Sequence, residues 1–243
     1  MAPIPLYPIS PAHYEQEYRY WPWGKLITAA AKLIAQKAPT SGVILDYMCG
    51  TGFLLQRVRE LRPDLRLFGC DINPDFVDYG RSHYPGIEFV CSDALIFAPR
   101  VTPDLIVCTG GIHHLDFRLQ PKFVAKLARE LGARGWLLVG EEVMREHDDE
   151  TKRRLAVVEL NKALLSIAIR RHAPDDLLRV SVELVERDLF LLGEYKLSER
   201  NLRALLKNDF AIAKSWSSWP SRTIPFGDRL LWCKPRRREP PRR

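Results

Sequence analysis

Short apolar runs alternate with helical segments along the first 140 residues of this 243-residue chain. Strands joined by helical crossovers pair in parallel and leave helices on both faces of the sheet. We predict strands at 43–47, 65–70, 87–91, 105–109 and 136–140, and helices at 51–61, 75–84 and 120–131. The predicted fold class is therefore α/β, doubly wound, with a mostly parallel sheet.

Two further apolar runs near the end of the chain complete the predicted sheet. Residues 210–216 and 229–233 are expected to be strands joined by a loop rich in Pro, Ser and Gly, after a helix at 198–207. Two consecutive strands with a short connection pair antiparallel. We therefore expect seven strands and an antiparallel C-terminal hairpin.

Two segments stand outside this alternation. Near the N-terminus, Tyr14, Tyr18 and Trp21 recur at helical spacing, and a second helical pattern follows the break at Trp21-Pro22. Residues 144–197 begin with a charged run and continue as a long amphipathic helix to about Arg171. The pattern leaves both helix and strand open for residues 174–194.

Composition limits the compartment and the partners. The longest apolar stretches are far shorter than the roughly 18 residues that span a bilayer, and the first residues lack the order of a signal peptide. The five cysteines include no CxxC pair and fit buried thiols in a reducing compartment. We expect a cytoplasmic protein with no membrane partner.

The net charge of +7 is concentrated at the C-terminus. The last ten residues hold six basic groups and one acidic group, so the first 233 residues carry a net charge of only +2. A high isoelectric point indicates nucleic-acid binding when the basic residues cover a folded face. Nucleic acid is therefore not an expected partner, and the sequence leaves the oligomeric state open.

Acidic residues follow three of the predicted strands. Asp46 ends the first strand and precedes Gly50 and Gly52, which let a ligand approach the backbone at the start of a helix. Asp71 ends the second strand, where a carboxylate can accept hydrogen bonds from ribose hydroxyls. Asp93 follows the third strand and can accept one from the exocyclic amine of a purine. The pattern predicts a nucleotide-type site at this edge of the sheet.

The loop Asp46-Tyr47-Met48-Cys49-Gly50-Thr51-Gly52 resembles that of the class I (Rossmann-like) S-adenosylmethionine-dependent methyltransferases, which often reads Asp-x-Gly-Cys-Gly-Thr-Gly. The resemblance covers residues 43–142 and the C-terminal hairpin, and it implies S-adenosyl-L-methionine as the cofactor. Met48 departs from the pattern. We expect methionine to require an ordinary φ there and so to change the shape of the loop.

The resemblance also implies which residues contact each part of the cofactor. Those near the methionine moiety are Asp46 and the backbone of Cys49, Gly50 and Gly52. Those near the nucleoside are Asp71 at the ribose, Ile72 on the adenine ring, and Asp93 with Ala94 at the adenine amine. Thr109 would lie near the sulfonium, and Tyr18 belongs to an aromatic face that can cover the cofactor.

The same resemblance divides the chain into functional segments. They are N-terminal lid helices (1–42), the cofactor-binding core (43–143), a substrate-cap insertion (144–197), the C-terminal helix and hairpin of the core (198–233) and a basic tail (234–243). The insertion follows the fifth strand, which is the usual place for a substrate cap in this class.

Methyl transfer needs a positioned nucleophile and, where a proton must leave, a general base. His113 and His114 follow the fourth strand, and many small-molecule methyltransferases of this class resemble the chain in having a His-His pair there. Glu141 lies on the same edge of the sheet. These three are the catalytic candidates, although the histidines can equally cap a loop carbonyl and pack under the next helix. No metal site is expected, because adjacent side chains point apart and no third ligand is evident.

We therefore expect a methyltransferase that acts on a small organic acceptor, an O, N or C nucleophile of secondary metabolism, with histidine as the base. Two alternatives stay open. An RNA or protein methyltransferase would use the basic tail as an anchor, but the Asn-Pro-Pro-Tyr-type motif of such enzymes is replaced by Thr109-Gly110-Gly111-Ile112. A cyclase would bind S-adenosylmethionine without transferring its methyl group.

Overall fold

A seven-stranded mixed sheet with helices on both faces forms the body of the protein, seen in a computed structural model that describes residues 9–132 and 134–236. The strands are β1 (Val43–Tyr47), β2 (Arg66–Asp71), β3 (Glu88–Cys91), β4 (Leu105–Thr109), β5 (Trp136–Val143), β6 (Phe210–Trp219) and β7 (Gly227–Pro235). The helices are α1 (Pro11–Tyr20), α2 (Trp23–Lys37), α3 (Phe53–Leu61), α4 (Pro74–His83), α5 (Gln120–Glu130), α6 (Glu150–Arg170), α7 (Asp175–Phe190), α8 (Glu199–Leu206) and the short 3-10 helix η1 (Ile112–His114).

The strand order across the sheet is β3-β2-β1-β4-β5-β7-β6. Strands β1 to β5 are parallel, and β7 runs antiparallel to its neighbours β5 and β6. This order confirms the predicted fold class, including the antiparallel C-terminal hairpin. The chain leaves β1 toward β2 on one side, and β4 pairs with β1 on the other. Ligands of open α/β sheets bind beyond the carboxyl ends of the strands at such a point.

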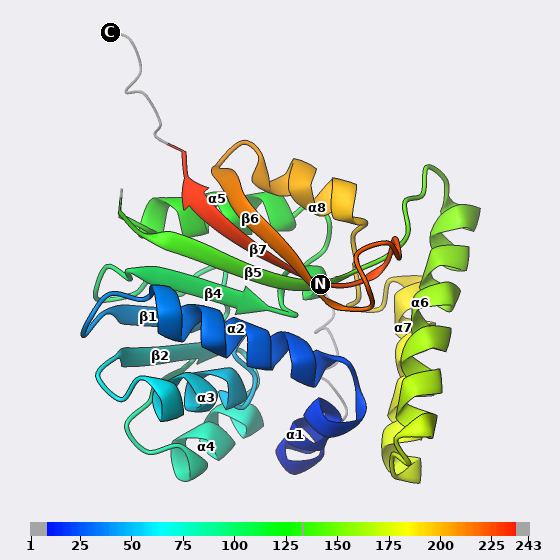
Figure 1. Ribbon diagram of the computed structural model, residues 1–243, viewed down its shortest axis with the longest axis horizontal. Coiled ribbons are helices and arrows are strands. Elements are labelled where there is room, and N and C mark those ends of the chain that lie inside the picture. Colours follow the sequence, from blue (N-terminus) through cyan, green and yellow to red (C-terminus); the bar gives the residue numbers. More distant parts are fainter. Residues whose placement is uncertain (1–8, 133, 237–243) are drawn as a thin grey trace, which may run out of the picture.

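Each face of the sheet has its own helices and its own core (Figure 1). Helices α2, α3 and α4 cover one face, and α5 and α8 cover the other. Side chains alternate between the faces along β1, so Ile44 packs with Leu26 of α2 while Leu45 packs with Phe123 of α5. Of the two predicted N-terminal helices, α2 is therefore part of the core, and only α1 lies beyond it.

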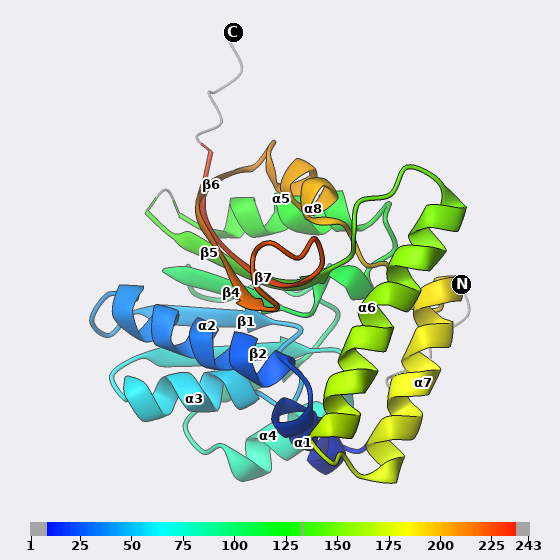
Figure 2. The same cartoon turned by 45° about the vertical axis from the view of Figure 1, so that its right-hand side comes forward.

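The cap, residues 144–197, forms a helical hairpin beyond the carboxyl ends of the parallel strands (Figures 1 and 2). Its first helix begins where the Asp149 side chain accepts a hydrogen bond from the N–H of Lys152 at 2.8 Å. The second helix, α7, settles the choice that the pattern left open. Two acidic residues favour its first turn, and Leu177 is buried.

The cap touches α1 at the turn between its two helices. Arg171 donates hydrogen bonds to the carbonyl oxygens of Arg19 and Trp21, at 3.2 and 3.1 Å. His13 of α1 lies 3.1 Å from Asp176 of α7. The two segments that the sequence assigned to the surroundings of the site are thus in direct contact (Figure 2).

The expected basic tail begins inside the sheet, because Lys234 and Pro235 are the last residues of β7. Lys234 donates hydrogen bonds to the carbonyl oxygens of Arg134 and Gly135, at 2.6 and 2.9 Å. The rest of the tail beyond Arg236 and the proline-rich start of the chain lie outside the described residues. No helix within 9–132 or 134–236 combines the length and apolar character needed to cross a bilayer.

Candidate active site

The loop between β1 and α3 has a left-handed backbone at both of its glycines. The φ angles of Gly50 and Gly52 are 55° and 85°, which glycine adopts at least cost. A Cβ at Gly50 would lie 2.8 Å from the ring of Tyr14, so a larger residue does not fit. Gly52 directly precedes α3, and the first N–H groups of a helix have no partner within it.

Met48 also adopts a left-handed backbone, with φ of 56°. The expectation that methionine requires an ordinary φ here is therefore wrong. Such a backbone costs a residue other than glycine about 1–3 kcal/mol. The side chain packs against the core on the α5 face, and its Sδ lies 2.8 Å from the position that a Cβ on Gly111 would occupy. This packing offsets the cost of the backbone.

Asp46, the penultimate residue of β1, has a carboxylate that lacks a partner in the described part of the chain. The residue is 1% exposed, and neither carboxylate oxygen accepts a hydrogen bond there. Burial, together with the nearby charge of Asp71, raises the pKa of Asp46 well above its ordinary value. Buried carboxylates without partners are rare because they are costly. This one indicates a ligand that brings a donor or a positive charge.

Asp71 ends β2 and holds the glycine loop in place. Its Oδ2 accepts a hydrogen bond from the N–H of Gly50 at 2.8 Å, and its Oδ1 accepts one from the N–H of Asn73 at 2.9 Å. Burial raises the pKa of Asp71, and the two N–H donors oppose that shift. Each carboxylate oxygen keeps a second lone pair for a further donor.

The remaining residues predicted at the nucleoside lie at neighbouring strand ends. Ile72 directly follows β2, and its side chain is 58% exposed. After β3, Asp93 accepts a hydrogen bond from the N–H of Leu95 at 2.8 Å, and Ala94 is buried. Thr109 ends β4. The structure thus brings these residues to the edge of the sheet that the sequence predicted.

The aromatic face of α1 meets the loop through Tyr14 and not through Tyr18. The Tyr18 ring stacks on Phe53 of α3, with ring centroids 4.2 Å apart, whereas Tyr14 lies against Gly50. Burial raises the pKa of both tyrosines. The spacing in the sequence predicts both rings on one helical face, and it does not indicate which ring reaches the loop.

His113 lies between two carboxylates. Its Nδ1 is 2.6 Å from Oε2 of Glu141, and its Nε2 is 3.4 Å from Oε2 of Glu194. Glu141 also accepts hydrogen bonds from the N–H groups of Gly111 and Ile112, at 3.1 and 2.8 Å, which ties η1 to β5. His113 therefore has a carboxylate in contact with Nδ1 and a second one facing Nε2.

His114 differs because its side chain is 45% exposed. Its Nδ1 lies 3.3 Å from Oε1 of Glu194 and 3.4 Å from the carbonyl oxygen of Gly193. Nε2 is on the opposite side of the ring from both contacts. Burial lowers the pKa of His114, but the Glu194 carboxylate outweighs that effect and the pKa is raised. The two rings do not point apart as expected, since their centroids are 4.2 Å apart and both face Glu194.

Glu194 comes from the cap, faces both histidines, and was not predicted from the sequence as a site residue. Lys196 lies 3.1 Å from its Oε2 and also donates to both oxygens of Asp188, at 2.9 and 3.1 Å. Burial raises the pKa of Glu194, but Lys196 and His114 outweigh it and hold the pKa well below its ordinary value. Glu194 follows a helix that the pattern did not resolve, so no signal in the sequence marked it.

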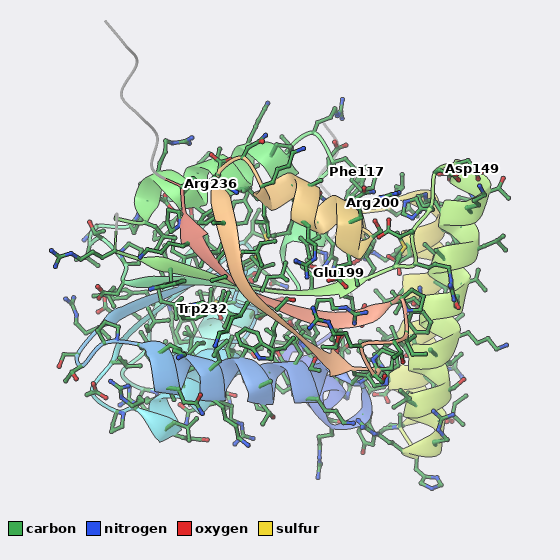
Figure 3. The ribbon with its side chains drawn as sticks, turned by 45° about the horizontal axis from the view of Figure 1, so that its top comes forward. Phe117, Asp149, Glu199, Arg200, Trp232 and Arg236 are labelled. Carbon is green, nitrogen blue, oxygen red and sulfur yellow. The ribbon has the colours of Figure 1, made fainter. Side chains whose placement is uncertain are left out.

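A hollow of about 420 Å³ adjoins this charged group from the α8 side. Phe117, Gln120 and Asn201 line it together with Lys196, which therefore lies between the hollow and Glu194. Figure 3 shows this side of the molecule, with Phe117 near α8 and Asp149 at the start of α6.

Comparison with known sequences identifies the central part of the chain. Residues 44–135 match a protein-family model described as a methyltransferase domain. The trans-aconitate 2-methyltransferase of Acidovorax sp. is 33% identical over 84 residues, which are 34% of this chain and 33% of that protein. The release factor glutamine methyltransferase of Mycobacterium leprae is 32% identical over 78 residues, 32% of this chain and 27% of that protein. The chain thus spans about a third of the length of the curated relatives it matches.

Solved structures extend the likeness to most of the fold. A protein of Pyrococcus horikoshii superposes with a TM-score of 0.61 at 17% identity, covering 91% of this chain and 92% of that one. The magnesium protoporphyrin IX methyltransferase of Synechocystis, with S-adenosylmethionine bound, gives 0.55 at 15% identity and covers 87% and 78%. Residues 44–135 thus match a methyltransferase domain, and the chain shares the fold of the class I S-adenosylmethionine-dependent methyltransferases. S-adenosylmethionine is the cofactor of that class.

Proposed function

We propose that this protein transfers the methyl group of S-adenosylmethionine to a small organic acceptor, an O, N or C nucleophile of secondary metabolism, with His114 as the general base. The observation that supports a small acceptor is the contact between α1 and the cap. Two segments that meet beyond the carboxyl edge of the sheet favour an enclosed acceptor over a flat macromolecular surface. Among the similar proteins, trans-aconitate 2-methyltransferase is named for a small acceptor.

The methionine end of the cofactor fits the loop after β1. Asp46 offers a buried carboxylate without a partner in the described chain, and the cofactor carries an α-ammonium group that can pair with it. The left-handed backbone at Gly50 and Gly52 allows a ligand to lie close to the main chain, beside Cys49. Asp46 therefore binds the ammonium group, and the loop backbone lines the methionine moiety.

The nucleoside end fits the next two strand ends. The spare lone pairs of Asp71 accept the ribose hydroxyls, and the exposed side chain of Ile72 packs on adenine. Asp93 and Ala94 face the adenine amine. Thr109 lies near the sulfonium, and Tyr18 supports Tyr14 in covering the cofactor.

The histidine pair acts on the acceptor. S-adenosylmethionine supplies a methyl group activated by a positively charged sulfur. The acceptor forms its bond to that methyl carbon as the carbon–sulfur bond breaks, and Nε2 of His114 takes the proton that the acceptor loses. Glu194 faces Nδ1 of the same ring and orients it. Glu141 and His113 fix the position of η1, on which His114 lies.

Two substitutions separate cofactor binding from catalysis. Asp71→Ala removes the ribose acceptor and the support of Gly50, and we expect the affinity for S-adenosylhomocysteine in calorimetry to fall about 100-fold or more. Asp78→Ala is the matched control, because Asp78 is exposed and its recorded ion pair is with Arg81. Equal affinity for Asp71→Ala and the parent would place the cofactor elsewhere.

His114→Asn should leave that affinity within about twofold and slow transfer by about 100- to 10,000-fold, the range of a lost general base. Turnover is followed by mass spectrometry over a library of small hydroxyl, amine and carbon acceptors. His83→Asn, at an exposed histidine of α4 whose Nδ1 lies 2.9 Å from the carbonyl oxygen of Tyr79, is the control and should match the parent. No methylated product from any acceptor would count against the proposed function. Full activity of His114→Asn would count against the base.

A further inference from the structure

Three side chains from two distant segments place nitrogen and oxygen atoms around one point. His113 and His114 come from η1, and Glu194 comes from the end of the cap. One potential ligand atom from each residue lies within 4.8 Å of the other two. The pairwise contacts are 3.4 Å from Nε2 of His113 to Oε2 of Glu194, and 3.3 Å from Nδ1 of His114 to Oε1.

These separations suit a metal ion better than they suit hydrogen bonds. A hydrogen bond between nitrogen and a carboxylate oxygen is typically about 2.7–2.9 Å long. A tetrahedral zinc ion bound at about 2.0–2.2 Å holds its ligand atoms about 3.3–3.6 Å apart. The two measured separations fall in that range. The carbonyl oxygen of Gly193, 3.4 Å from Nδ1 of His114, adds a further oxygen at the same spacing.

The surroundings of His113 match those of a metal-binding histidine. Such histidines almost always donate their other ring N–H to a carboxylate or carbonyl, which fixes the tautomer and aims the free nitrogen at the metal. Glu141 lies 2.6 Å from Nδ1 of His113, and two backbone N–H groups hold that carboxylate. Nε2 of His113 is thereby directed at Glu194.

The charge around the three ligands also favours a cation. Three further carboxylates lie one contact away, because Glu141 contacts His113, while Glu142 and Asp188 contact Lys196. Lys196 is the opposing positive charge, 3.1 Å from Oε2 of Glu194, but both oxygens of Asp188 already engage it. Oε1 of Glu194 remains directed at His114.

We propose that His113, His114 and Glu194 bind one divalent transition-metal ion, with zinc as the best match to two imidazoles and a carboxylate. The half-exposed ring of His114 provides access from solvent. The ion site itself rests on this geometry, and only its effect on catalysis rests on the proposed function. A metal on Nδ1 leaves the ring proton on Nε2, so the bound ion removes the general base and suppresses methyl transfer.

Calorimetric titration of the chelator-treated full chain with zinc chloride tests the site. We expect one zinc ion per chain, and a loss of affinity of about tenfold or more in Glu194→Gln and in His114→Asn. His83→Asn should bind zinc as the parent does. The affinity of each variant for S-adenosylhomocysteine, measured on the same samples, shows that the variant is folded. It also reports on the cofactor site separately.

A second probe identifies the ligands. Cobalt replacing zinc at a tetrahedral nitrogen and oxygen site should give visible absorption that Glu194→Gln loses, while Cys91→Ser, at an exposed thiol, leaves it unchanged. The proposal is overturned if no saturable zinc binding occurs, or if binding survives Glu194→Gln and His114→Asn at parental affinity. Loss of the cobalt signal in Cys91→Ser would also overturn it. Each of these results can occur with intact cofactor binding, so none is confused with failure of the proposed function.

Discussion

The carboxylate of Asp46 stabilises the folded chain only when something pairs with it. It is buried without a partner among the described residues, and its pKa is raised above its ordinary value, mainly by burial. A raised pKa in the folded state means that the carboxyl group costs nothing at a pH below its unfolded pKa. The group destabilises the fold as the pH rises and it is forced to ionise.

Asp46→Asn should therefore make the cofactor-free protein more stable at pH 7, by about 1–3 kcal/mol in the free energy of unfolding. The gain should shrink as the pH falls toward the unfolded pKa, and the affinity for S-adenosylhomocysteine should drop because the partner of its ammonium group is lost. Urea unfolding over a pH series measures the first effect, and calorimetry measures the second. A parent more stable than the variant at neutral pH would mean that Asp46 has a partner in the free protein.

The sequence predicts the position of those candidate site residues that local chain geometry places at the edge of the sheet. Asp46, Asp71 and Gly50 follow from a strand that ends before a tight turn. The prediction of an ordinary φ for Met48 is wrong, because packing of its side chain against the α5 face outweighs the preference of methionine for negative φ. Glu194 was not found, since it reaches the histidines through the folding of the cap and no local pattern encodes that contact.

The short apolar strands match their predicted bounds more closely than the other elements do. Strands β1 and β4 have the predicted bounds, because each is a short apolar run between turn residues. Helix α7 buries Ser181 and Asp188 on the same side as Leu177, so its apolar period is obscured and the pattern does not distinguish helix from strand. Strand β6 extends to Trp219, beyond its predicted end, because pairing with β7 continues where the apolar run has stopped.

The contact between α1 and the cap is an interaction between elements that one substitution can test. Arg171→Ala removes two hydrogen bonds to the carbonyl oxygens of Arg19 and Trp21. Because the guanidinium is exposed, we expect a modest loss of about 1 kcal/mol, seen as roughly fivefold faster hydrogen exchange in α1. Arg170→Ala, at the exposed neighbouring position, is the control. Unchanged exchange in α1 after Arg171→Ala would show that the cap does not hold this helix.

At the scale of the whole molecule, the fold class follows from the sequence, whereas the attachment of the cap does not. Alternation of strands and helices is enough to predict the parallel sheet. The cap is held by buried charges that lie far apart along the chain. Asn161 of α6 donates to Asp188 of α7 at 2.9 Å, Asp188 pairs with Lys196, and Lys196 lies 4.0 Å from Glu142 of β5. This chain of contacts joins the cap to the sheet beside the histidine pair.

Lys196 is the one link in those contacts with a positive charge, and its pKa is raised because Asp188 and Glu194 outweigh the effect of burial. Lys196→Met should lower the free energy of unfolding in urea by about 3–5 kcal/mol, since it leaves buried carboxylates without their partner. Removing a carboxylate as well, in Lys196→Met with Asp188→Leu, should recover part of that loss. Lys162→Met, at an exposed lysine of α6, should stay within about 0.5 kcal/mol of the parent. If the single and double variants lose the same free energy of unfolding, then apolar contacts hold the cap and the buried charges do not contribute to its attachment.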